Sequence, residues 1–213
     1  RLQKVINKIN SDLDDFQFGL VSQELYDFVW NEFCDWYIEA IKSRLYQDED
    51  QIAKTTAQYK GVTVLEKILR LLHPIMPFIT EEIWQKLPQT KETIMYEKWP
   101  KSLERNLDQE AEDRMNLVME IIKAIRNIRN EMKVDPGRKI DAILDSPQKS
   151  VAILKEGSKY IKDLAKVKDL TIKTDLEAKP EKSSTAIVND IEIILPLEGM
   201  VDIDKEISRL EKE

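Results

Sequence analysis

The sequence is poor in the residue types that build most catalytic and metal sites. Its 213 residues include one cysteine, Cys34, and one histidine, His73. A single cysteine excludes an internal disulfide and is typical of a reducing compartment. A lone histidine in a turn between helices has no partner residues with which to hold a metal ion. We therefore expect no catalytic residue and no metal ligand in this chain, and a structural role for His73.

Glycine is scarce and long apolar runs are missing. Five glycines are too few for a glycine-rich fold, and no P-loop or dinucleotide-binding fingerprint occurs, so we expect no bound nucleotide cofactor. No stretch approaches the ~20 apolar residues of a membrane span, and no secretory signal is visible. These absences favour a cytoplasmic protein that works by binding.

Charged residues are abundant, but their balance is acidic. There are 33 Lys and Arg residues against 40 Asp and Glu residues, which gives a net charge of −7. Such a chain can bind RNA only where its basic residues are clustered, because a polyanion responds to the local field within a Debye length of ~8–10 Å. Any RNA-binding site must therefore be sought as a local basic patch.

Apolar residues repeat with helical period over the first two-thirds of the chain. We predict helices over residues 2–16, 21–46, 52–72, 80–87 and 107–132, with a turn at Gly19 and a short extended piece at 94–96. The last of these helices has the cleanest amphipathic pattern. This pattern predicts a mainly α protein, with a helical bundle over residues 1–136.

The period changes at Asp135-Pro136-Gly137. Residues 139–145 alternate as a strand does, a helix follows, residues 170–172 form a second strand, and Asn189-Asp190 joins two strands in a hairpin. This predicts a small α/β domain over 137–200. Residues 201–213 begin a coiled-coil-like apolar stripe that runs to the last residue, so we expect the chain to be a fragment.

Residues 72–84 predict a stiff apolar corner between two helices. Pro74 disfavours helical backbone in the residue before it, so the preceding helix is expected to end near His73. We expect Pro77 to keep the connector extended and Thr80 to be the N-cap of the next helix. Ile79 and Trp84 then have the spacing of a hydrophobic staple. Such a corner would fix how the two helices cross.

This corner, His-Pro-x-x-Pro-Phe-x-Thr-Glu-Glu-x-Trp, resembles the helical anticodon-binding domain of the class I aminoacyl-tRNA synthetases for valine, isoleucine and leucine. Two further segments resemble the valyl members of that family. They are residues 33–39, Phe-Cys-Asp-Trp-Tyr-Ile-Glu, and residues 193–206, which are similar to the start of a C-terminal coiled-coil arm. The three segments occur in family order, and the resemblance covers nearly the whole chain.

The resemblance implies an intact enzyme that activates valine with ATP and transfers it to tRNA(Val). The ATP-binding signatures His-Ile-Gly-His and Lys-Met-Ser-Lys-Ser are absent, so this chain would be the anticodon-binding part, without catalytic activity alone. Its expected partners are the anticodon stem-loop and the rest of the same synthetase chain, and the expected state is a monomer. The family usually has a further helix ahead of Arg1, with an Asn-Ala-x-Arg-Phe-like segment that would hold some anticodon contacts.

The best basic patch lies at the end of the long predicted helix. Glu131 and Asp135 are the acidic residues over the same span. At about 100° per residue, Arg126 and Lys133 share one flank of the apolar stripe, which is the one-sided arrangement that phosphate contact requires. Solvated charges and pairs along the helix would give the same pattern. The candidate residues of this patch are Lys123, Arg126, Arg129, Lys133 and Arg138, followed by Lys139.

A second candidate lies early in the third predicted helix, at Lys54, Gln58 and Lys60. Side-chain donors beside an aromatic ring, here Tyr59, suit unstacked loop bases. The acidic residues 48–50 would repel phosphate, and an ordinary exposed helix end is the alternative interpretation. Two other functions also stay open for the whole chain: the equivalent domain of an isoleucyl or leucyl enzyme, and a helical protein-interaction module with no RNA role.

Overall fold

The computed structural model describes residues 1–46, 50–88, 92–176, 178–180 and 182–196. The chain divides into two compact units, Arg1–Asp108 (unit 1) and Gln109–Glu213 (unit 2), and each is described by itself. The first is helical and the second combines helices with a sheet, which confirms the predicted fold class. Within the described residues, no helix is both long and apolar enough to cross a membrane.

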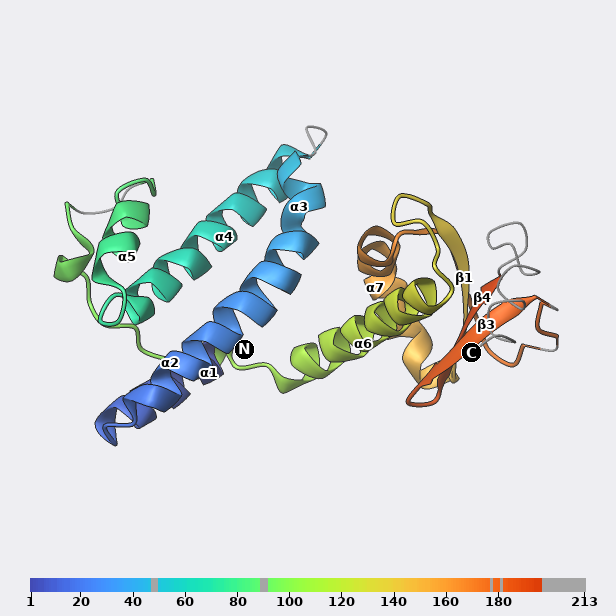
Figure 1. The fold of residues 1–213 in the computed structure, drawn as a ribbon, viewed down its shortest axis with the longest axis horizontal. Helices are drawn as coiled ribbons and strands as arrows, with labels where there is room; N and C mark the ends of the chain where they lie inside the picture. The colour runs from blue at the N-terminus through green and yellow to red at the C-terminus, as the bar shows by residue number, and fades with distance from the viewer. Residues whose placement is uncertain (47–49, 89–91, 177, 181, 197–213) are drawn as a thin grey trace, which may run out of the picture. The chain divides into compact units, whose positions relative to one another are not determined.

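Unit 1 is built from long helices that lie side by side (Figure 1). They are α1 (Leu2–Asp14), α2 (Phe18–Asp27), the π-helical segment η1 (Phe28–Ile38), α3 (Glu39–Tyr46), α4 (Gln51–Leu72) and α5 (Pro77–Trp84). Two 3₁₀ turns follow, η2 (Ile94–Tyr96) and η3 (Glu104–Asn106). Because α2, η1 and α3 are continuous, they form one rod, and α3 packs against α4.

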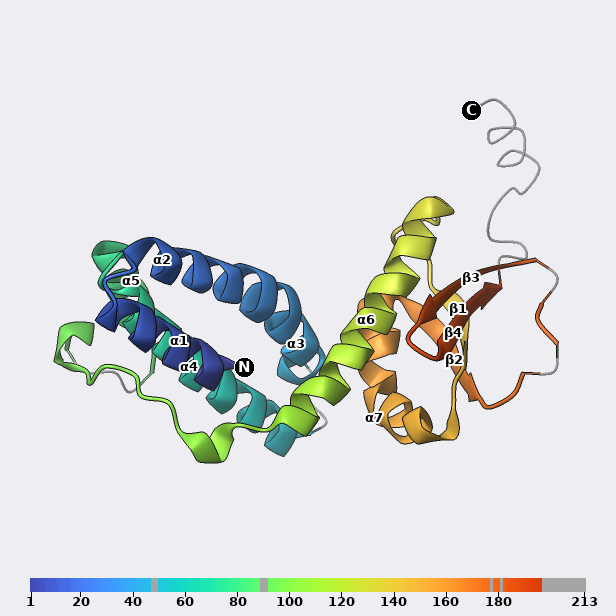
Figure 2. The same cartoon turned by 90° about the horizontal axis from the view of Figure 1, so that it is seen from below.

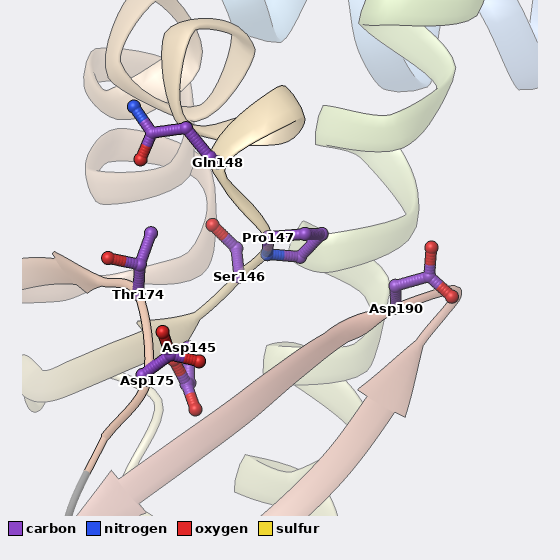
Figure 3. A pocket seen from close by; sticks show the side chains of 7 residues that line it. All are labelled: Asp145, Ser146, Pro147, Gln148, Thr174, Asp175 and Asp190. Carbon is purple, nitrogen blue, oxygen red and sulfur yellow. The ribbon is translucent and has the colours of Figure 1, made fainter.

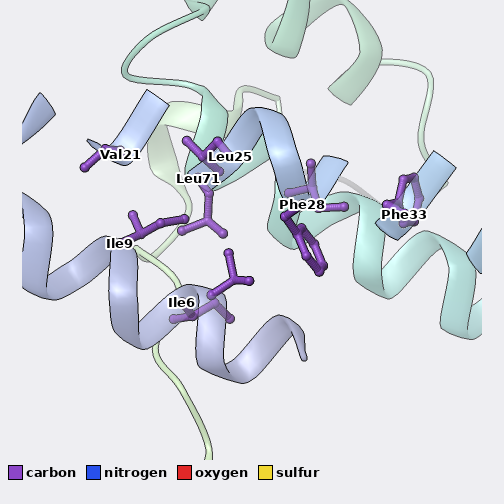
Figure 4. Close-up of a cluster of buried hydrophobic side chains, with 9 residues drawn as sticks. Ile6, Ile9, Val21, Leu25, Phe28, Phe33 and Leu71 are labelled. Atoms are coloured by element: carbon purple, nitrogen blue, oxygen red, sulfur yellow. The ribbon is translucent and has the colours of Figure 1, made fainter. Parts of the chain in front are cut away.

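The core of unit 1 lies between α1, the α2–η1 rod and α4 (Figure 4). Apolar residues at helical spacing form this core, so the helical period in the sequence identifies the buried face of each helix directly. A second cluster of Leu69, Trp84 and Ile94 joins α4, α5 and η2. The buried residues of the first cluster are Val5, Ile6, Ile9, Val21, Leu25, Phe28, Phe33, Ile68 and Leu71.

The predicted turn at Gly19 and the predicted extended piece at residues 94–96 were both wrong. The second helix begins at Phe18, and Gly19 lies in its first turn rather than before it. The turn is at Phe16, whose φ is 57°, where Gln17 N donates to Asp12 O and closes the end of α1. Residues 94–96 are a 3₁₀ turn rather than an extended piece, because the Thr93 hydroxyl accepts from Met95 N at its start.

The helix after the corner begins three residues earlier than predicted. As expected, α4 ends at His73, but Pro77 opens α5, because a residue without an N–H and with a fixed φ suits the first helical position. Thr80 is therefore not an N-cap, and Ile79 with Trp84 is not a staple. The buried Thr80 hydroxyl donates to Met76 O at 2.7 Å and lies 2.8 Å from His73 Nδ1.

Unit 2 packs two helices on one face of a sheet (Figure 2). Its elements are α6 (Gln109–Glu131), β1 (Ile140–Asp145), α7 (Gln148–Ala165), β2 (Val167–Lys173), β3 (Ser183–Val188) and β4 (Ile191–Pro196). The strand order is β2-β1-β4-β3, with β1 parallel to β2 and the other pairs antiparallel. Asn189, with a φ of 51°, turns the predicted β3–β4 hairpin.

The helices of unit 2 approach each other at Gly157 of α7. A Cβ placed there would lie 2.5 Å from Val118 Cγ2 of α6, so a glycine permits the contact.

The coiled-coil prediction for 201–213 lies outside the described residues. The predicted domain boundary at residue 136 stays a prediction; by packing, α6 lies with α7, β3 and β4 in unit 2.

Candidate nucleic-acid interface

The end of α6 shapes the basic patch. Lys133 has a φ of 51°, the left-handed conformation that ends a helix. Lys133 N donates to Asn130 O, and Val134 N donates to Arg129 O at 2.9 Å, so the last carbonyls of the helix are satisfied. Val134 is buried while Lys133 is exposed. This cap turns the chain back under the helix and leaves the Lys133 side chain in solvent.

Arg129 is placed differently from the other predicted residues. Its side chain is only 6% exposed, and its guanidinium donates to the carbonyls of Asp135, Arg138 and Lys166 at 2.9–3.4 Å. Burial lowers the pKa of Arg129 and the Asp135 carboxylate raises it, but a guanidinium remains charged in either case. Arg129 thus binds the 135–138 loop and the end of α7 to α6.

These hydrogen bonds gather cations at one end of unit 2. Arg126 is half-buried and its Nε donates to Leu164 O at 2.9 Å, beside the end of α7. Ile140 N donates to Lys166 O, which places Lys166 next to the start of β1. Lys166 is exposed, and sequence reasoning missed it because it is 33 residues beyond Lys133. The cluster, called here the cationic end, comprises Lys123, Arg126, Lys133, Arg138, Lys139 and Lys166.

The cationic end has the electrostatic character that phosphate contact needs. Lys123, Lys133 and Arg138 are exposed, and Glu131 and Asp135 are the acidic residues on the same segment. The carbonyl ends of α6 and α7 both face this region, and a helix C-terminus favours cations beside it. The structure therefore brings together the α6 residues and the loop residues that the sequence predicted, and adds Lys166, the residue that follows α7.

The second candidate lies on α4, in unit 1. Lys54 is half-buried, and Gln58 and Lys60 are exposed beside Tyr59, whose side chain is 68% exposed. Lys54 and Gln58 are one turn apart and share a face of the helix, whereas Lys60 lies nearly opposite Gln58. Asp50 caps the helix, where its carboxylate accepts from Ala53 N at 2.9 Å. The structure brings two of the three predicted residues to one face.

A pocket of about 490 Å³ lies at the opposite end of β1 from the cationic end (Figure 3). Its wall carries the carboxylates of Asp145, Asp175 and Asp190, of which Asp190 pairs with Lys149 at 2.8 Å. Such a wall repels phosphate, so this pocket is unsuited to RNA. Among the described residues, no group of three His, Cys, Asp or Glu side chains is placed to hold a metal ion.

Comparison with known proteins decides the family. The family described as the anticodon-binding domain of tRNA ligase matches residues 1–144. This chain belongs to that family. The matched range contains all of unit 1, the whole of α6 and the loop that follows it, so both candidate sites lie inside the anticodon-binding domain except for Lys166.

Valine–tRNA ligases are similar to the whole chain. The enzyme of Syntrophotalea carbinolica is 44% identical over 216 residues, that of Bacillus subtilis (strain 168) 41% over 214, and that of Symbiobacterium thermophilum 40% over 233. Each match covers 100% of this chain but only 24–26% of the relative. The chain thus spans about a quarter of these relatives and corresponds to their C-terminal region.

Proposed function

We propose that this chain is the tRNA-binding C-terminal part of a valine–tRNA ligase and that it recognises the anticodon stem-loop of tRNA(Val). The observation that carries the proposal is the 41–44% identity to valine–tRNA ligases over the whole chain, which includes both units. A match confined to the helical bundle would leave the isoleucyl and leucyl enzymes equally good candidates. Similarity that continues through the sheet supports the valyl enzymes.

The two candidate sites have different tasks in this proposal. The cationic end contacts phosphates, which fixes the position of the RNA but carries no information on its sequence. The α4 site offers amide and ammonium donors and the ring of Tyr59 to unstacked bases, the mode by which proteins read RNA loops. Arg129 acts indirectly, because it holds the loop that carries Arg138.

The chemistry of the proposed enzyme belongs to the rest of the polypeptide. Activation of valine with ATP and its transfer to tRNA require a catalytic part that this chain does not contain. The chain alone is then a tRNA-binding protein with no ligase activity, and the complete enzyme is a cytoplasmic monomer.

The decisive experiment is titration of this chain with tRNA(Val) and with the same tRNA carrying a changed anticodon. We expect tighter binding of the native tRNA, because phosphate contacts are equal in the two molecules and only base contacts differ. One correct set of base contacts is worth about 1–3 kcal/mol, roughly a 5- to 150-fold difference in Kd. Weak binding that ignores the anticodon would instead favour the protein-interaction module.

A further inference from the structure

The corner between α4 and α5 exposes apolar side chains in an unbroken run. Residues 74–79 are all exposed, and the Phe78 ring is 89% exposed. No charged residue occurs from 74 to 80, in a chain that is 34% charged. Contiguous exposed apolar surface of this kind marks a site of interaction with another protein surface.

A second exposed segment lies against the same helix. Glu81 Oε2 of α5 accepts from Thr93 Oγ1 at 2.8 Å and from Ile94 N at 3.2 Å. These bonds hold η2 beside α5, one turn from Phe78. Met95 and Tyr96 of η2 are 75% and 70% exposed. We call these exposed side chains the corner patch: Ile75, Met76, Phe78, Ile79, Met95 and Tyr96.

The corner patch is held in one shape before any partner binds. Pro74 and Pro77 restrict the backbone, and the Thr80 hydroxyl joins Met76 O and Pro77 O to His73. Below the patch, Trp84 is only 1% exposed and packs with Leu69 and Ile94. A rigid surface loses little conformational entropy on binding, which favours a permanent interface.

The corner patch offers no cation to RNA. The carboxylates of Glu81 and Glu82 follow the apolar run, and hydrogen bonds, from Gln85 to Glu81 and from Lys86 to Glu82, lower their pKa values. Both are therefore ionised at neutral pH; Glu82 pairs with Lys86 at 2.8 Å, and Glu81 adds negative charge beside the patch. An RNA-binding surface would need cations beside its aromatic rings, and segments 74–80 and 93–96 contain none.

We infer that the corner patch is the surface on which the catalytic part of the same polypeptide docks. This inference rests on the proposed function, since it requires a longer polypeptide; similar valine–tRNA ligases have about three-quarters of their length outside the match. The docked surface is apolar and uncharged, with a hollow for the Phe78 ring. Docking there leaves Lys54 and Gln58, near the start of α4, to the tRNA.

Hydrogen exchange tests this docking in the full-length enzyme that carries this chain. The amides of Phe78 and Ile79 lie in the first turn of α5, where the helix supplies no acceptor, so their exchange depends on what covers them. We expect slow exchange over 78–80 and 94–96 in the full-length enzyme and faster exchange in residues 1–213 alone. Phe78→Glu, and separately Met95→Glu, should raise the exchange rate in the full-length enzyme about tenfold or more, as loss of a buried anchor does.

A matched control is Ile187→Glu, which changes a 74% exposed apolar residue on β3, outside the patch. It should leave exchange at the corner unchanged. Equal exchange rates in the full-length enzyme and in residues 1–213 would overturn the inference. So would protection of the corner in residues 1–213 that appears with added tRNA or with rising protein concentration, because the occupant would then be RNA or a second copy. The tRNA titration of residues 1–213 tests the proposed function separately, since its outcome does not depend on docking.

Discussion

Arg129 is the residue whose role differs most between sequence and structure. In the sequence it is one cation of a basic patch, next to the apolar stripe of a helix. In the structure it is buried and donates to three carbonyls, so it organises the loop after α6. The sequence shows the charge of a side chain and its approximate helix face, but the carbonyls that it meets come from residues 6 to 37 positions away.

Replacement of Arg129 by Met should destabilise unit 2. The change keeps much of the apolar stem and removes the guanidinium, which leaves the carbonyls of Asp135, Arg138 and Lys166 without these donors. We expect a loss of about 2–4 kcal/mol in the free energy of unfolding, measured by urea denaturation. Arg126→Met is the control: its side chain is half-buried and donates to Leu164 O, so the loss should be about 1 kcal/mol or less. Similar losses for the two variants would show that Arg129 does not hold the loop.

Lys133 and Arg126 should each contribute to the salt dependence of tRNA binding. For each phosphate contact that is removed, the slope of log Kd against log salt concentration should fall by roughly one unit. We therefore expect Lys133→Ala and Arg126→Ala to weaken binding and flatten this slope. Lys149→Ala, at the acidic pocket beyond the opposite end of β1, is the control and should leave the slope unchanged. Unchanged slopes in all three variants would remove the cationic end from the interface.

At the scale of elements, the prediction for Pro77 in the α4–α5 corner was wrong. Pro77 is compatible with an extended connector and with the first turn of a helix, and local sequence does not distinguish these. The outcome depends on Thr80, which is buried and closes the corner with His73 instead of capping a helix. A threonine before two glutamates is a good N-cap signal, but the tertiary contacts of this threonine outweigh it.

The packing of α6 on α7 gives a further prediction. In a solvated helix, Gly157→Ala would be stabilising by up to about 1 kcal/mol. Here the new Cβ would lie 2.5 Å from Val118 Cγ2, so the Val118 side chain or the helices must shift. We expect Gly157→Ala to lower the free energy of unfolding by about 1–3 kcal/mol, measured by thermal or urea denaturation.

Val118→Ala in the Gly157→Ala background provides the decisive comparison. Removing the two methyl groups that oppose the new Cβ should recover part of the lost stability, although Val118→Ala alone is destabilising. Such a non-additive pair is the mark of direct contact. Additive losses in the double variant would mean that α6 and α7 do not meet at these residues.

At the scale of the whole molecule, two partitions of the chain differ. The anticodon-binding domain family matches residues 1–144, whereas packing places α6 with the sheet of unit 2 and ends unit 1 at Asp108. The long helix α6 thus belongs to the domain by ancestry and to the sheet by its contacts. Its apolar stripe is buried against α7, β3 and β4, which follow it in the chain.

The sequence by itself determined the secondary structure of most of the chain and its family. Helical period, strand alternation, the Asn189-Asp190 turn and three recognisable segments are all local patterns. Residues close together in the sequence form such patterns, so they can be recognised without the structure. It also located the basic residues of α6 and the following loop.

Only the tertiary structure decided which of those basic side chains face solvent. It buried Arg129, brought Lys166 to the cationic end, and left the α4–α5 corner exposed. The physical reason is the same in each case: burial and hydrogen-bond partners depend on residues distant in the chain, and a pattern along the sequence contains no measure of those distances.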